Sequence, residues 1–361
     1  MRSLALMLLS LTLSVPILVA QTDVDIAVLR TKAEAGDVKA EVALARAYES
    51  GTGVPHDDAR AFDLYLRAAK AGDPEAQNAV AFNYRSEKNF TESLKWYGLA
   101  AKQGNANAMF NLGTHYYNGD GVPIDDVQAA SWFWLARKAG SKRAEDAVAR
   151  GEHDLSPSQL SEVKLTVADM LAEGKAVPRD TATAMAVYQD AGRYGKPEVQ
   201  VRIAKVFLNG WGVPEDAAKA ETYCRTALDL EKNFLPAILC IAYLDQSGRL
   251  GDNRRKEAFS WYEKAYNSGS PLGAYGLGIA YANGDGTQKN YEKAFTYLVI
   301  ASLSNVEVAI PLAKQLEQKF SPDTLKKLVK KANEEKKKKG IFDFGLLDRQ
   351  FAYVVKVDRL P

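Results

Sequence analysis

A short glycine-rich turn recurs along this chain. The sequence Gly-x-Gly-Val-Pro occupies residues 51–55, 119–123 and 210–214, and a weaker copy, Gly-Asp-Gly-Thr, occupies residues 284–287. Recurrence at this scale is typical of solenoids, in which each unit stacks on its neighbours because it cannot bury an apolar face alone. Solenoids present extended binding surfaces more readily than active sites. The recurring turn therefore favours a scaffold over an enzyme.

Each unit follows a plan of two helices joined by this turn. In the first unit Ala40, Leu44 and Tyr48 are spaced one helical turn apart, which predicts a single packing face. The glycines then end that helix, because glycine tolerates the left-handed conformation that a helix stop requires. Pro55 favours an extended exit from the turn, and the aspartates at 57–58 are placed to cap the second helix.

Glycines that close successive units predict about seven helix-turn-helix repeats. The first of these closing glycines are Gly36, Gly72, Gly104 and Gly140. The second unit lacks the glycine turn, and the fourth is degenerate around Gly174. The expected fold is an all-α solenoid of about seven repeats.

The pattern resembles the Sel-one-like repeat family, a relative of the tetratricopeptide repeat. The resemblance is carried in the third unit by Ala108, Leu112, Gly113, Tyr116, Gly119 to Val122, Asp125, Ala129, Trp132 and Phe133, and in the seventh by Ala274, Leu277, Gly278, Tyr281, Gly284, Gly286, Lys293, Ala294 and Tyr297. It covers most of residues 33–310. It implies a right-handed superhelix of helix pairs that acts as an adaptor between proteins.

Two segments that lack the next glycine turn are expected to cap the solenoid. Each carries a Ser-Pro pair, at Ser156 and at Ser321, before another helix. We therefore expect a first array over residues 21–163, with three repeats and a cap, and a second over 164–339, with four repeats and a cap. The β-prone residues 340–361 are interpreted as a segment that docks in the chain's own groove, as a strand added to a partner, or as a loose terminus.

The first twenty residues differ from the rest. Arg2 precedes an apolar run from Leu4 to Val19, and the small Ala20 follows it. This order is typical of a secretory signal peptide, and the alternative is an uncleaved membrane anchor. We expect residues 1–20 to direct export, with the mature chain periplasmic or extracellular.

The overall charge points to no class of polyelectrolyte partner. The formal net charge is +2 with 25% charged residues, so we expect no nucleic-acid partner. Lysines gather near the end, however, with ten between Lys314 and Lys339 against four acidic residues. One interpretation is a solvated helix; the other is a weak contact of residues 326–339 with anionic lipid or polymer.

No motif for catalysis or for a cofactor is recognisable. The three histidines, His56, His115 and His153, are not at metal-ligand spacing with a Cys, an Asp or one another. The Gly-x-Gly elements lack the preceding strand and the third glycine of a dinucleotide-binding loop. We expect no catalytic residue, metal or cofactor, and an enzyme acting on cell-wall polymers is the weakest alternative.

The only two cysteines occupy packing positions of neighbouring units. Cys224 stands where other units have an aromatic residue, and Cys240 stands where others have the glycine after leucine. The two sulfurs are therefore expected close together, either as a disulfide or as two buried thiols.

The function expected from these observations is a non-catalytic adaptor of the cell envelope. It would bind a protein or peptide along a concave face formed mainly by the first helix of each unit. The candidate contact residues are Asn78, Asn111 and His115, outside the apolar stripe, and Trp211, inside a glycine turn. The alternative is a structural organiser in a complex that assembles envelope polysaccharide or cell wall.

Overall fold

Helices make up all of the regular secondary structure in the described part of the chain. The structure, a computed structural model, describes residues 26–192 and 196–343, and these residues form helices and turns but no strand. The all-helical prediction is confirmed. The expected leader at residues 1–20 and most of the β-prone segment, residues 344–361, lie outside the described residues.

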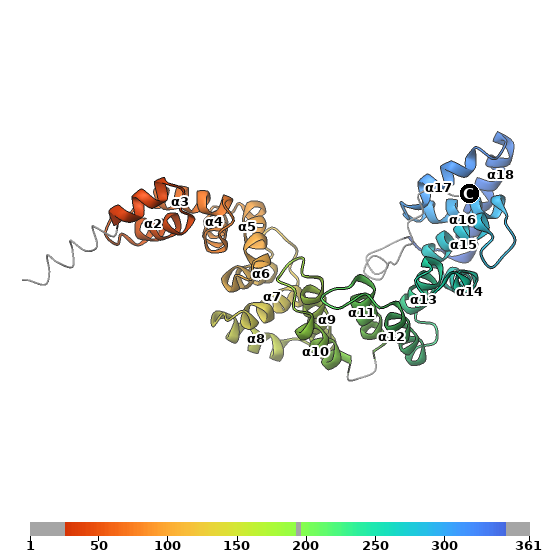
Figure 1. The fold of residues 1–361 in the computed structure, drawn as a ribbon, viewed down its shortest axis with the longest axis horizontal. Helices are drawn as coiled ribbons and strands as arrows, with labels where there is room; N and C mark the ends of the chain where they lie inside the picture. The colour runs from red at the N-terminus through yellow and green to blue at the C-terminus, as the bar shows by residue number, and fades with distance from the viewer. Residues whose placement is uncertain (1–25, 193–195, 344–361) are drawn as a thin grey trace, which may run out of the picture. The chain divides into compact units, whose positions relative to one another are not determined.

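The helices fall into two compact units that divide between Asp180 and Thr181. In the first unit residues 26–34 are helical, followed by α2 (Val38–Ser50), α3 (Asp58–Lys70), α4 (Pro74–Ser86), α5 (Phe90–Lys102), α6 (Ala106–Asn118), α7 (Asp126–Lys138), α8 (Arg143–Asp154) and α9 (Pro157–Glu173). The second unit holds α10 (Thr181–Ala191), α11 (Pro197–Asn209), α12 (Ala217–Leu230), α13 (Leu235–Ser247), α14 (Arg255–Asn267), α15 (Pro271–Asn283), α16 (Tyr291–Leu303), α17 (Ala309–Glu317) and α18 (Pro322–Lys339) (Figure 1).

Within each unit the helices pack as pairs, and each pair stacks on the next. The pairs are α2–α3, α4–α5 and α6–α7 in the first unit, and α11–α12, α13–α14 and α15–α16 in the second (Figure 1). The second helix of each pair also contacts the first helix of the following pair. This is the helix-turn-helix stacking that the repeat predicts.

The glycine turn is held by the same bonds in each repeat that has it. At the end of α6, Gly119 adopts the left-handed conformation, with φ 76°, and so stops the helix. Asp125 then caps α7 by accepting a hydrogen bond from the backbone N–H of Gln128, at 2.9 Å. The backbone N–H of Asp125 donates to the carbonyl of Tyr116, at 3.1 Å. Equivalent ties join Asp57 to Tyr48, Asp216 to Phe207 and Asn290 to Tyr281.

The degenerate fourth repeat keeps this turn although its sequence has decayed. Gly174 ends α9 in the left-handed conformation, and the N–H of Asp180 donates to the carbonyl of Leu171 at 2.9 Å. The array boundary expected between residues 163 and 164 falls inside α9, a continuous helix that packs on α7. The two compact units instead divide after Asp180.

The Ser-Pro pairs begin helices, as predicted. Ser156 accepts a hydrogen bond from the N–H of Gln159, and Ser321 accepts one from the N–H of Thr324, both at 3.3 Å. In each case the proline occupies the first turn, where it needs no hydrogen-bond partner. These residues start α9 and α18, and α18 ends at Gly340.

Candidate partner-binding groove

A candidate binding surface is a groove in the first unit, with a volume of about 440 Å³. Four helices contribute to it: α2, α3, α4 and the start of α6. Its lining residues are Arg46, Glu49, Asp58, Ala61, Phe62, Tyr65, Glu75, Asn78, Ala79, Phe82, Asn83, Ser86, Asn105 and Asn107. The groove therefore follows one face of α4, on which Glu75, Asn78, Phe82 and Ser86 are spaced by one turn.

Aromatic side chains form the apolar part of the groove. Phe82 is 61% exposed, an unusual position for so large an apolar ring. Phe62 packs edge-to-face on Tyr84, with the ring centroids 5.8 Å apart. The Tyr65 hydroxyl donates to the Glu49 carboxylate at 2.8 Å, and burial together with this negative charge raises the pKa of Tyr65. Phe82 is thus an exposed ring beside a fixed aromatic wall.

Asn78 and Asn111, two of the residues expected to contact a partner, are brought together. The Asn111 side-chain amide donates to Oδ1 of Asn78, at 3.2 Å. Asn111 is only 5% exposed, whereas Asn78 is half-buried and lines the groove. Asn111 therefore positions Asn78, and the Nδ2 group of Asn78 remains as a donor at the groove.

His115 lies in the core of the first unit. It is fully buried, its Nδ1 lies 2.7 Å from the carbonyl oxygen of Asp120, and its Nε2 lies 3.1 Å from Ser93 Oγ. Burial lowers the pKa of His115, which favours the neutral ring. The expectation that His115 contacts a partner is corrected, because its ring has no exposed surface.

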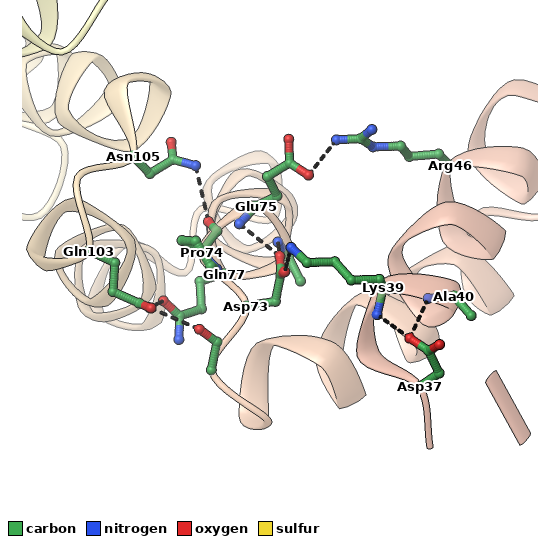
Figure 2. Close-up of polar contacts among 12 residues, drawn as sticks. Asp37, Lys39, Ala40, Arg46, Asp73, Pro74, Glu75, Gln77, Gln103 and Asn105 are labelled. Atoms are coloured by element: carbon green, nitrogen blue, oxygen red, sulfur yellow. Dashed lines mark hydrogen bonds and ion pairs between the residues drawn. The ribbon is translucent and has the colours of Figure 1, made fainter. Parts of the chain in front are cut away.

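Polar side chains around the start of α4 tie this helix to its neighbours (Figure 2). Asp73 caps α4 by accepting the backbone N–H groups of Glu75 and Ala76, and it also binds the Lys39 ammonium at 2.8 Å. Burial alone would raise the pKa of Asp73, but the Lys39 and backbone hydrogen bonds outweigh it and hold that pKa below its ordinary value. Asp37 caps α2 in the same way.

Similar contacts involve the loop before α6. The side-chain amide of Asn105 donates to the carbonyl of Pro74 at 3.2 Å, and that of Gln103 donates to Gln77 Oε1 at 2.8 Å (Figure 2). Gln77 is buried and donates to the carbonyl of Ala69. Gln77 thus joins the second repeat to the first, and Gln103 and Asn105 tie the end of the second repeat back to its start, so the groove has a fixed edge.

The charges along the groove are predominantly negative. Arg46 forms an ion pair with Glu75 at 2.7 Å, and both side chains are more than half exposed (Figure 2). Glu49 and Asp58 add two further carboxylates, with no second cation among the lining residues. A cationic segment therefore suits this groove better than an anionic one.

Trp211 belongs to the second unit and is half-buried in its glycine turn. Its backbone carbonyl accepts a hydrogen bond from the Thr181 hydroxyl at 2.7 Å, and the Lys205 ammonium lies 5.1 Å from its ring centroid. Contact with a partner remains a prediction for this residue.

Cys224 of α12 and Cys240 of α13 form a disulfide in the structure, and both are fully buried. The bond joins two neighbouring helix pairs, as the packing positions of the two cysteines suggested. It lies in a small apolar cluster with Ala204, Leu208 and Leu244. The disulfide is therefore part of the core of the second unit.

Sequence reasoning missed the main groove residues. Phe82, Phe62 and Arg46 were not singled out, although Phe82 follows Asn78 by one helical turn and lies outside the alanine stripe. Within residues 26–192 and 196–343 no group of His, Cys, Asp or Glu is arranged to hold a metal ion. None of the helices in these residues combines the length and the apolar character that a membrane span requires.

Curated relatives share part of this chain. It is 26% identical over 267 residues to the chitin synthase regulator SKT5 of Saccharomyces cerevisiae, covering 72% of this chain and 36% of that protein. It is 30% identical over 169 residues to an exopolysaccharide production negative regulator of Rhizobium leguminosarum bv. viciae, covering 44% of this chain and 59% of that protein. The matched part thus spans less than two thirds of either relative.

A solved structure of a Sel1 repeat protein from Oxalobacter formigenes is 24% identical, with a TM-score of 0.39, and the match covers 82% of this chain and 81% of that one. The Sel1 repeat itself matches at residues 38–73, 74–105, 106–141, 197–231, 238–270 and 271–305. The unmatched residues between 141 and 197 are those for which the sequence predicted a degenerate fourth repeat. With six repeats over more than half of its length, the chain belongs to the Sel1 repeat family.

Proposed function

We propose that this chain is an adaptor that binds a segment of another protein in the groove of its first unit. The exposed Phe82 ring, beside the fixed amide of Asn78, is the observation that carries the proposal. Sel1 repeats typically mediate protein–protein interaction, and relatives of this chain are named as regulators. Large aromatic side chains surrounded by polar groups are the usual centres of such interfaces.

The chemistry of the groove favours an extended segment with an apolar residue and a nearby lysine or arginine. The apolar residue would pack on Phe82, and Asn78 would donate to a backbone carbonyl. The positive charge would face Glu49 and Asp58, because Arg46, the one Lys or Arg among the residues that line the groove, already pairs with Glu75. Binding should accordingly weaken as salt is raised.

The test uses the full chain to capture a partner from extract, followed by affinity measurement with that purified partner. Phe82→Ala is expected to weaken binding about thirtyfold, since an interface centre contributes about 2 kcal/mol. Leu99→Ala is the matched control, because Leu99 of α5 is also exposed, at 42%, but does not line the groove. Equal affinity of both variants would refute the groove as the binding site.

A second candidate is regulation of polysaccharide synthesis at the envelope. The relatives favour it, since one is named a chitin synthase regulator and another an exopolysaccharide production negative regulator. Here the adaptor's partner would be a component of such a synthase. Loss of the gene should change the amount of envelope polysaccharide, and Phe82→Ala should reproduce that change.

We also propose that this chain is exported and that its lysine-rich residues 326–339 contact anionic lipid or polymer. The buried Cys224–Cys240 disulfide supports export, because disulfides persist in oxidising compartments. Cell fractionation and N-terminal sequencing of the mature protein test the export. Cosedimentation with anionic vesicles, at low and high salt, tests the lysine contact.

A further inference from the structure

A second cavity lies in the second unit, where α18 closes over the last matched repeat. It has a volume of about 250 Å³ and is lined by side chains of α14, α16 and α18. Because the last repeat match ends at residue 305, α18 lies outside the repeats. The cavity is therefore particular to this end of the chain, and its size is below that of pockets for drug-sized molecules.

Two tyrosines form one wall of this cavity. Tyr266 and Tyr297 pack edge-to-face, with ring centroids 5.1 Å apart and ring planes at 90°. Tyr297 also stacks on Tyr281, with centroids 5.7 Å apart and nearly parallel rings. These contacts fix the orientation of both rings, so the wall is formed before any ligand binds.

The hydroxyl of Tyr266 is an unsatisfied donor. Tyr266 is 4% exposed, and its hydroxyl has no hydrogen-bond partner among the described residues. Burial, together with the nearby Tyr297 and the Glu335 charge, raises the pKa of Tyr266, so the hydroxyl keeps its proton. A buried hydroxyl without an acceptor destabilises the fold. A ligand that supplied an acceptor would recover part of this cost.

Charges of both signs line the same cavity. Lys331 and Lys339 come from α18, while Glu335 of α18 and Glu263 of α14 supply carboxylates. The Lys339 ammonium is held by Asn267 Oδ1 at 2.9 Å and lies 5.7 Å from the Tyr266 ring centroid. Within the part of the chain that the structure describes, Lys331, Glu263 and Glu335 form no ion pair.

These observations select against ligands of a single charge. An anion would lie near Glu263 and Glu335, and a cation would lie near Lys331, Lys339 and Lys293 of α16, which also lines the cavity. Glu335 lies one helical turn from both Lys331 and Lys339 on α18, so a molecule whose two charges lie close together would satisfy both sets. Its carboxylate would also accept the hydrogen bond that the Tyr266 hydroxyl lacks.

We propose that the cavity between α14, α16 and α18 binds a small zwitterion of the amino-acid class. The carboxylate lies toward Lys331, Lys339 and the Tyr266 hydroxyl. The ammonium lies toward Glu263 and Glu335, and the side chain packs on the tyrosine wall. This site is separate from the groove of the first unit, and its occupancy does not depend on the proposed adaptor function.

The experiment is isothermal titration of the full chain with each of the twenty amino acids, and with acetate and methylammonium as probes of one charge. At least one amino acid is expected to bind at millimolar concentration or tighter, and the two probes are expected not to. Tyr266→Phe should weaken that binding about tenfold, the equivalent of one hydrogen bond. Lys331→Ala should weaken it further, whereas Lys326→Ala, on α18 but outside the cavity, should not.

Tyr266→Phe is chosen so that a loss of binding cannot be attributed to misfolding. The variant keeps the ring and removes only an unsatisfied hydroxyl, so its thermal stability should equal or exceed that of the unmodified chain. Absence of binding by all twenty amino acids would overturn the proposal. So would equal binding of acetate or methylammonium, or unchanged affinity in Tyr266→Phe.

Discussion

At the scale of single residues, the second glycine of the turn is fixed by two constraints. Gly121 has φ +76°, and a Cβ atom placed on it would lie 2.5 Å from the Cβ of Phe90, the first residue of α5. Gly286, at the same place in the last repeat, would meet the carbonyl oxygen of Lys256. The residue is glycine for its backbone conformation and for the approach of the preceding pair.

Gly121→Ala is therefore expected to lower the free energy of unfolding by about 2 kcal/mol or more, from left-handed strain and overpacking together. Gly98→Ala is the matched control, because Gly98 lies inside α5 with no atom within 4 Å of an added Cβ. It should raise stability by about 0.5–1 kcal/mol. Urea unfolding measures both changes, and a similar loss in the two variants would contradict the role of the turn.

Asp245 makes the stability of the fold depend on pH. It is fully buried beside the Arg254 guanidinium, at 2.8 Å, and burial raises the pKa of Asp245 to about 6 against the opposing charge of Arg254. The unfolded carboxyl titrates near its ordinary value of about 4. Between about pH 4 and 6 the folded chain therefore binds more protons than the unfolded chain, and stability falls as the pH rises.

Because the folded and unfolded pKa values of Asp245 differ by about two units, the free energy of unfolding falls by about 3 kcal/mol over this range. Asp245→Asn should remove this part of the pH dependence, whereas Asp252→Asn should keep it, because the Asp252 side chain is 85% exposed. Urea unfolding from pH 4 to pH 8 provides the test. The assignment is wrong if the two variants show the same slope.

At the scale of helices and turns, the sequence was informative because the determinants are local. The caps at Asp57 and Asp125 and the stop at Gly119 depend on residues within a few positions of one another. The same holds for the fourth repeat, whose turn at Gly174 survives although the repeat is not matched as Sel1. Local rules therefore predicted the helix-turn-helix plan.

The groove could not be predicted in this way, because exposure depends on which neighbours cover a helix face. Asn111 and His115 share a face of α6, as Asn78 and Phe82 share one of α4. In α6 that face is covered, since Phe90 and Tyr97 of α5 pack on the His115 ring at 5.9 and 5.7 Å. The corresponding face of α4 remains exposed. The difference in exposure between the two helix faces comes from tertiary packing.

The disulfide is a cross-link between neighbouring helix pairs. Cys224 and Cys240 are separated by 16 residues, a loop for which a disulfide contributes about 3 kcal/mol through the unfolded state. Replacing both cysteines by alanine is expected to lower the free energy of unfolding by about that amount. A reductant present throughout unfolding should destabilise the unmodified chain similarly and leave the variant unaffected. If neither the double substitution nor the reductant changed the free energy of unfolding, the cross-link would not be formed in solution.

At the scale of the whole molecule, the repeats are the unit of stability. In the described residues each helix pair packs mainly on the pairs beside it, so stability is close to a sum over repeats and their interfaces. The core of the second unit illustrates this, with one cluster around the disulfide and a larger one around Leu277, Leu298 and Leu312. The disulfide thus reinforces one interface in a series.

Hydrogen exchange tests this arrangement in the double-alanine variant. Amides of α12 and α13 should lose the most protection, those of α14 and α15 less, and those of α16 and α18 least, because the loss passes from one interface to the next. The first unit, compact in its own right, provides the reference amides. An equal loss from α11 to α18 would mean that the second unit opens as a single cooperative body, and nearest-neighbour coupling would then be the wrong description.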